Sequence, residues 1–377
     1  MRVIDLHTHI LPPSWPDLAE RAGTRGWLEI THLGGDKGGG AAGGAAGGGA
    51  GGSGCACARL TIDGRHFRDI EANCWDPAAR IRECDAHGVS AQVLSTVPVM
   101  FSYHQPAHAA LTLGRHLNDH IAEVVRAHPT RFIGLGTVPM QDTELACREL
   151  DRCLDELGMR GVEIGSNINA RRGDGVTELN LDAPELFPFF EHCARRGAAV
   201  FIHPWNMMGQ ASVQKYWLPW LVGMPAETAR AACSLMFGGV LLRLPSLKVC
   251  LAHGGGSLAF TIGRIAHGFR ERPDLCAIDV PCDDTGDPRA QMRRFYFDTL
   301  VHDEAALRFL IDAVGASRLA LGSDYPFPLG ERVAGTLIRG MHGLSDADRA
   351  RMLAGTAEEF LGLGSDSCAT PRQASPR

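Results

Sequence analysis

Short apolar runs alternate with longer mixed segments along most of this chain, and the residues between them are typical of strand and helix ends. Asp76 and Pro77, for example, begin a segment that ends at Gly88, as a capped helix does. The apolar runs predict eight strands, at residues 3–6, 91–95, 132–138, 162–164, 199–203, 247–252, 295–297 and 319–321. Eight strands joined by helices predict an α/β fold of the (β/α)8 TIM-barrel type, with functional residues at the carboxyl ends of the strands.

Residues 1–363 are expected to form one barrel domain, although 377 residues would also suffice for two smaller domains. The alternative architecture is an open, doubly wound sheet, but no Gly-x-Gly-x-x-Gly turn supports dinucleotide binding. Residues 34–58 are nearly all Gly and Ala and predict a flexible insertion after the first strand, and residues 364–377 predict a disordered tail. The alternating stretch 58–68 predicts a hairpin beside the barrel mouth.

Charge and composition argue against several classes of partner. The net charge of −6 at pH 7 argues against nucleic acid and against an anionic membrane surface. No apolar stretch is long enough to span a bilayer, and the first ten residues carry charges and histidines rather than the pattern of a signal peptide. The 12 cysteines include no Cys-x-x-Cys pair, which favours reduced thiols. We therefore expect a cytoplasmic protein.

Five residues of metal-binding type follow the predicted strands. His7 and His9 are two positions apart at the end of the first strand, so both imidazoles can face the same side. His203, His253 and Asp324 each follow a later apolar run. Taken singly, each could be a hydrogen-bonded core residue or a turn former. Because strand ends converge at one face of a barrel, the joint pattern predicts a metal site.

The distribution of lysine limits what this site can be. The three lysines are Lys37, Lys215 and Lys248, and none stands at the carboxyl end of a strand. A Schiff base, a pyridoxal cofactor or a carbamylated lysine bridging two metals would each lack its residue. The simplest site is therefore one metal per chain, held by three imidazoles and one carboxylate. These ligands suit Zn2+, while iron, cobalt and manganese remain alternatives.

Longer motifs carry a resemblance to a known family. The chain resembles the amidohydrolase superfamily in its metal-dependent decarboxylase branch, from the first residues to about residue 364. The resemblance is carried by the segments HTH, FIHPW, AHGGG, LGSDYPFPLG, NCWDP, STVPVMFSY, KYWLPWLVGMPAET and RPDLCA. The Gly/Ala segment departs from the family pattern, which has a short stretch there.

The resemblance implies a role for each of the residues at the strand ends. It implies that His253 is catalytic and contacts a metal-bound water, whereas a fifth ligand or a structural histidine are the other interpretations from the residues alone. Asp324 is expected to serve catalysis as well as the metal. The implied zinc ligands are His7, His9, His203 and Asp324.

The resemblance also implies a substrate and a reaction. The substrate is a conjugated semialdehyde with two carboxylates, and the reaction is its non-oxidative decarboxylation in the kynurenine pathway of tryptophan catabolism. Arg68 is implied to bind a carboxylate, and Arg272 to reach the pocket of the partner chain in a homodimer. Trp220 and Phe327 are implied to line the apolar pocket, although core packing is the alternative for such side chains.

Two other functional classes stay open at this point. A metal-dependent hydrolase, or another aromatic or enoic acid decarboxylase of the same superfamily, would share these ligands. A non-catalytic metal-binding protein would be expected to have lost part of the site, yet every expected position is filled.

Overall fold

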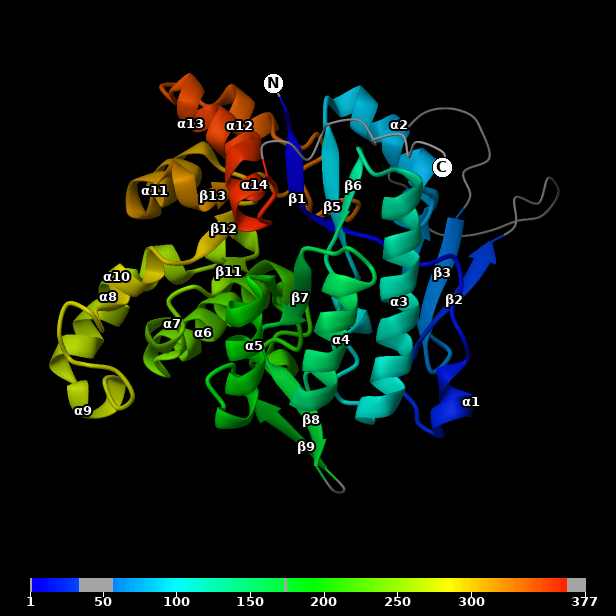
Figure 1. Ribbon diagram of the computed structural model, residues 1–377, viewed down its shortest axis with the longest axis horizontal. Coiled ribbons are helices and arrows are strands. Elements are labelled where there is room, and N and C mark those ends of the chain that lie inside the picture. The colour runs from blue at the N-terminus through cyan, green and yellow to red at the C-terminus, as the bar shows by residue number, and fades with distance from the viewer. Residues whose placement is uncertain (1, 34–56, 173–174, 365–377) are drawn as a thin grey trace, which may run out of the picture.

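A computed structural model describes residues 2–33, 57–172 and 175–364 of the chain. Eight parallel strands occupy the centre of the fold (Figure 1). One sheet has the order β1-β5-β6 and the other the order β13-β12-β11-β10-β7. The central strands are β1 (Ile4–His9), β5 (Ala91–Ser95), β6 (Phe132–Gly134), β7 (Gly161–Gly165), β10 (Ala199–His203), β11 (Lys248–Leu251), β12 (Tyr296–Asp298) and β13 (Leu319–Ala320).

Parallel bridges at two seams join these sheets into a closed barrel. Gly136 pairs with Val162 between β6 and β7, and Thr8 pairs with Tyr325 between β1 and the segment after β13. At the second seam the Leu6 amide also donates to the carbonyl of Leu321 at 2.7 Å. The predicted (β/α)8 barrel is therefore confirmed, and the open doubly wound alternative is wrong.

The strand predictions agree with the structure to within a few residues. β5 and β10 have the predicted bounds, whereas β6 ends at Gly134 instead of residue 138. β1 extends to His9, so both histidines of the first motif lie within the strand. Lys248 begins β11, and its Nζ donates to the carbonyl of Phe360, at the opposite end of the strand from His253.

Helices surround the barrel and bury its outer surface (Figure 1). The first long helix is capped as predicted: Asp76 accepts from the Ala78 amide, Pro77 occupies the first turn, and Gly88 ends the helix with φ of 66°. None of the helices in the described residues is long and apolar enough to cross a bilayer. The main helices are α2 (Pro77–His87), α3 (Ala107–Ala127), α4 (Thr143–Asp155), α5 (Phe187–Arg196), α6 (Met224–Phe237), α8 (Leu258–Glu271) and α11 (Glu304–Val314).

Shorter helices complete the connections and the carboxyl-terminal part of the described chain. They are α1 (Leu18–Ala22), α7 (Val240–Arg243), α9 (Pro273–Cys276), α10 (Pro288–Met292), α12 (Thr336–Gly340), α13 (Asp346–Ala350) and α14 (Thr356–Phe360).

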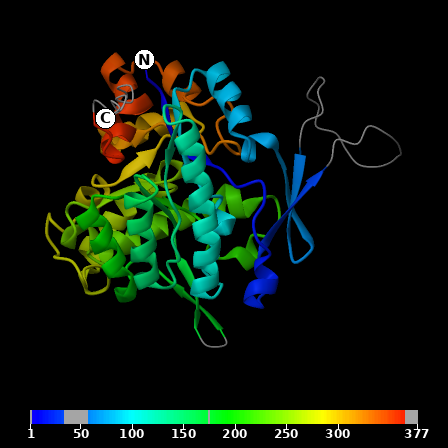
Figure 2. The same ribbon diagram turned by 45° about the vertical axis from the view of Figure 1, so that its right-hand side comes forward.

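An antiparallel sheet stands beside the barrel (Figure 2). It consists of β2 (Leu28–Leu33), β3 (Cys57–Ile62) and β4 (Arg65–Glu71). The predicted hairpin is confirmed as β3 and β4, and β2 pairs with β3 as a third strand. Cys57 and Ala58, assigned to the Gly/Ala insertion, belong to β3 because their backbone groups pair with β2 and β4. Residues 34–56 and 365–377 lie outside the described residues. A second hairpin pairs β8 (Ile168–Arg172) with β9 (Gly175–Leu179).

Candidate active site

The strand ends bring the predicted metal ligands together in the interior of the barrel mouth. His7 and His9 come from β1, His203 ends β10, and Asp324 follows β13. All four are buried, with exposed fractions between 0% for His7 and 9% for Asp324. One ligand atom from each of the four lies within 4.8 Å of the others. This spacing is compatible with a single ion.

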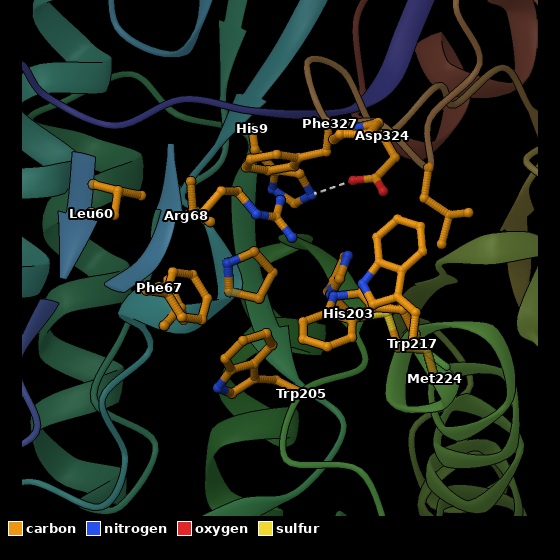
Figure 3. Close-up of a pocket in the computed structure, with 16 residues that line it drawn as sticks. His9, Leu60, Phe67, Arg68, His203, Trp205, Trp217, Met224, Asp324 and Phe327 are labelled. Carbon is orange, nitrogen blue, oxygen red and sulfur yellow. Dashed lines mark ion pairs between the residues drawn. The ribbon is translucent and has the colours of Figure 1, made fainter. Parts of the chain in front are cut away.

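Individual distances show how closely the donor atoms approach. His7 Nε2 lies 3.1 Å from His9 Nε2, and Asp324 Oδ1 lies 3.5 Å from the first and 3.1 Å from the second. The ion pair between His9 and Asp324 is visible in Figure 3. A tetrahedral ion with bonds of about 2.0–2.1 Å separates its ligands by about 3.3 Å, so this packing fits such an ion.

Hydrogen bonds on the far side of each imidazole orient its ring. His7 Nδ1 donates to Asp298 Oδ2 at 2.7 Å, and His9 Nδ1 donates to the Thr96 carbonyl at 2.8 Å. His203 Nδ1 donates to the Pro204 carbonyl at 3.0 Å. Because these acceptors cannot donate, Nδ1 carries the proton and each Nε2 offers a lone pair toward the centre. His203 Nε2 is buried and has no hydrogen-bond partner among the described residues, as expected of a metal donor.

Electrostatics at His203 and Asp324 favour the protonation states that a metal requires. Burial and the neighbouring histidines hold the pKa of His203 well below its usual range, so this imidazole is neutral at pH 7. Burial raises the pKa of Asp324, but the close contact with His9 and the nearby imidazoles of His7 and His253 outweigh it and hold the pKa at about 2. A neutral imidazole and an ionised carboxylate are the ligand forms that bind metal.

His253 lies beside this group, just after β11. Its Nε2 is 4.0 Å from Asp324 Oδ2, and its ring centroid is 5.0 Å from that of His203. Burial and the neighbouring His7 lower the pKa of His253 to about 4, so the imidazole is neutral and able to accept a proton. The next residue, Gly254, has φ of 61°, and a Cβ there would meet Val301 at 2.4 Å. This glycine therefore serves the tight turn that follows His253.

Asp298, at the end of β12, is a site residue that the sequence predictions missed. It is completely buried, and its Oδ2 accepts from the His253 amide as well as from His7 Nδ1. Its Oδ1 accepts from the amides of Gly254 and Leu300. Its position after an apolar run is the same signal that identified Asp324. The carboxylate of Asp298 thus orients both His7, a predicted ligand, and His253, the candidate base.

Asp298→Asn is expected to weaken metal binding about 10–100-fold, as the loss of an outer partner of a ligand does. The asparagine NH2 group would face backbone amides that are themselves donors. The side chain would then no longer hold His7 in its present orientation. Competition with a metal chelator measures the affinity. Asp303→Asn is the matched control, because Asp303 only caps α11. An unchanged affinity in the Asp298 variant would contradict the role given to this carboxylate.

An apolar pocket opens over the candidate ligands, and Arg68 of β4 contributes its cation (Figure 3). The Arg68 guanidinium carbon lies 4.8 Å from the centroid of the Phe327 ring, which is itself 5.6 Å from the His9 ring. Burial lowers the pKa of Arg68, although a guanidinium remains charged at pH 7. The apolar wall of the pocket consists of Leu60, Phe67, Val97, Pro98, Val99, Trp205, Trp217, Trp220, Met224, Phe327, Pro328 and Leu329.

Arg272 is the one predicted site residue that the structure brings neither to the candidate ligands nor to the pocket over them. It is the first residue after α8, is exposed, and pairs with Asp274 at 2.7 Å. Figure 1 places the adjacent helix α9 far from β3 and β4, the strands beside the pocket. Within one chain, therefore, Arg272 does not line the pocket.

Comparisons with known proteins agree with this fold and site. The family model described as "Amidohydrolase" matches residues 4–363. A 2-amino-3-carboxymuconate-6-semialdehyde decarboxylase of Dictyostelium discoideum is 52% identical over 96% of this chain and 91% of its own length. The protein of the same name from Caenorhabditis elegans is 34% identical over 96% of this chain and 94% of its own.

Solved structures add a metal-containing relative. A dihydroxybenzoic acid decarboxylase from a Polaromonas species, with bound manganese and an inhibitor, superimposes with a TM-score of 0.69 at 26% identity. The match covers 79% of this chain and 90% of that one. On these matches the chain belongs to the amidohydrolase family, within its decarboxylases, and is similar to those named for 2-amino-3-carboxymuconate 6-semialdehyde.

Proposed function

We propose that this enzyme decarboxylates 2-amino-3-carboxymuconate 6-semialdehyde, without oxidation, to 2-aminomuconate 6-semialdehyde in tryptophan catabolism. The observation that carries the proposal is the 52% identity to the Dictyostelium relative of that name, over nearly the whole chain. The site geometry is in keeping with it, because converging metal donors, a neutral histidine and a pocket arginine are what such a reaction needs.

The metal would be one Zn2+ per chain, held by His7, His9, His203 and Asp324. The buried Nε2 of His203, which no described residue hydrogen-bonds, and the spacing of the four donors support the fit. When bound, such an ion acts as a Lewis acid and lowers the pKa of water to about 7. The manganese in the Polaromonas structure makes Mn2+ the alternative, and elemental analysis of purified protein distinguishes the two metals.

Four groups of residues in the chain have separate roles in the proposed reaction. His253 takes up a proton at Nε2, since the ring is neutral and faces the ligand group. Arg68 binds a substrate carboxylate through its forked N–H groups, which a largely desolvated pocket strengthens. Phe327 and Trp220 pack against the flat conjugated chain and exclude water. Asp324 serves as a ligand and stabilises a proton held on His253.

Adding the semialdehyde to metal-loaded protein tests the proposal. Loss of the substrate absorbance should be accompanied by one carbon dioxide per turnover, and no hydrolysis product should form. Hydrolysis would support the hydrolase alternative, and the absence of any reaction would support a metal-binding protein without catalysis. A parallel assay with 2,6-dihydroxybenzoate, the ligand of another decarboxylase of the family, tests whether an aromatic acid is the preferred substrate.

Arg272 is proposed to complete the substrate site of the partner chain in a homodimer. Its exposure, and its absence from the pocket of its own chain, are compatible with that role. Mixing inactive Arg272→Ala chains with inactive His253→Ala chains should then restore activity. Each mixed dimer would have one intact site and one doubly altered site.

The recovered activity should reach about one quarter of wild type if subunits exchange freely and pair at random. Mass measurement of the mixture confirms that exchange has occurred. The control is the same mixing of His203→Ala chains with His253→Ala chains. Each chain then carries a change in its own site, so no mixed dimer can have an intact site. Exchange without recovery in the Arg272 mixture would show that Arg272 does not act across the interface.

A further inference from the structure

Arg80, on helix α2, is a buried cation that none of the roles above explains. Its exposed fraction is 0%, which makes it one of the largest completely buried side chains of the described residues. No carboxylate among the described residues forms an ion pair with it. Burying a charge without an ion pair costs free energy. The guanidinium must therefore be stabilised by other contacts.

Its hydrogen bonds converge on the strand that carries two of the proposed ligands. One terminal nitrogen donates to the His9 carbonyl at 2.6 Å and to the Asn73 carbonyl at 3.1 Å. The other donates to the Thr8 hydroxyl at 3.0 Å, and Nε donates to Gln92 at 3.2 Å. Arg80 thus fixes both the backbone of His9 and the residue that separates the two histidines.

The face of the guanidinium contacts the segment that carries Asp324. Its central carbon lies 4.6 Å from the centroid of the Tyr325 ring, a cation–π contact. The Tyr325 hydroxyl donates to Glu83, on the same helix as Arg80, at 2.7 Å. The Tyr325 carbonyl accepts from the His9 amide at 2.8 Å. Helix α2 therefore holds His9 and the residue after Asp324 against one another.

Asp324 needs such support because its backbone is in an unfavourable conformation. Its φ is 56°, in the left-handed region that residues other than glycine rarely adopt. In this conformation its Oδ1 lies 3.1 Å from His9 Nε2. Without a contact that holds Tyr325, the segment could relax and carry the carboxylate away from the imidazole.

We propose that Arg80 is a positioning residue of the metal centre, which sets the separation of His9 and Asp324 by binding the backbone of one and the ring that follows the other. This inference rests on the proposed function only in assuming that the four residues bind a metal. A lysine could not replace Arg80, because an ammonium lacks the planar face and the fork that reach acceptors on several sides at once.

Arg80→Lys and Arg80→Met test the proposal through metal affinity and the visible spectrum of the Co2+-loaded protein. Affinity should fall about 10–100-fold in Arg80→Met, as for other outer-sphere partners, and the Co2+ bands should shift in both variants because the ligand geometry changes. The matched control is Arg131→Met. Arg131 also donates to backbone carbonyls, those of Val89 and Ser90, but at the amino end of the barrel.

Wild-type affinity and an unchanged Co2+ spectrum in a folded Arg80→Lys protein would overturn the proposal, as would an equal loss of affinity in Arg131→Met. If neither Arg80 variant folds, Tyr325→Leu decides, because it keeps the cation and removes the ring. That variant should lose affinity, and retention of wild-type binding would count against the clamp. A wild-type protein that binds no metal refutes both this proposal and the proposed function. Metal binding without decarboxylation refutes only the function.

Discussion

His203→Ala is expected to lose the metal and the activity together. Among the four proposed donors, the buried Nε2 of His203 has no hydrogen-bond partner in the described residues, and its removal takes one of four donor groups from the site. The loss of affinity should exceed the roughly 10–100-fold that outer partners contribute. Metal content by elemental analysis, measured beside carbon dioxide release, checks the result. Asp324→Asn should behave in the same way, because a neutral amide replaces the only carboxylate of the donor set.

His192→Ala is the matched control for this prediction. His192 lies on α5 and pairs with Asp151 at 2.8 Å, away from the barrel mouth. Its removal should leave metal content and turnover unchanged. Full metal occupancy in His203→Ala would show that the ion is held elsewhere, and the assignment of the four ligands would be wrong.

The barrel and its candidate ligands could be predicted because both depend on local patterns. A buried parallel strand is a short apolar run, and a polar residue directly after it lies at the mouth of the barrel. His203 and Asp324 were identified in this way. The resemblance to the family then distinguished the proposed ligands from His253, a distinction that strand ends alone do not make.

The residues that were missed act through contacts that no local pattern records. Asp298 carries the strand-end signal, but its importance lies in four hydrogen bonds. The turn after β11, β1 and its own loop supply them only after folding. Arg80 lies on a helix whose sequence gives no sign that its cation is buried. Glu163, in β7, lies 3.7 Å from His9 Nδ1 but stands inside an apolar run, and burial raises its pKa to about 8. Arg272 was predicted, but its proposed role requires a second chain and cannot be judged from the contacts of one.

His253→Ala is expected to keep nearly one metal per chain while losing turnover. His253 Nε2 is 4.0 Å from the nearest Asp324 oxygen, whereas the four proposed donor atoms form their own group without it. Removing it should therefore leave the donor set intact. A general base contributes about 10²–10⁴-fold to rate, so kcat should fall by that factor.

The pH profile of the wild type gives a second view of the same residue. Burial and the neighbouring His7 lower the pKa of His253 to about 4. The sign follows from the base role: the neutral ring is the active form, so activity limited by this group should be retained near neutral pH and lost as pH falls toward 4. His253→Ala should lack that acidic limb in its residual activity. His192→Ala, on the outer helix α5, again serves as the control and should retain both the rate and the limb. If the His253→Ala protein binds no metal, this histidine is a fifth ligand. If it binds metal and has normal turnover, another group takes up the proton.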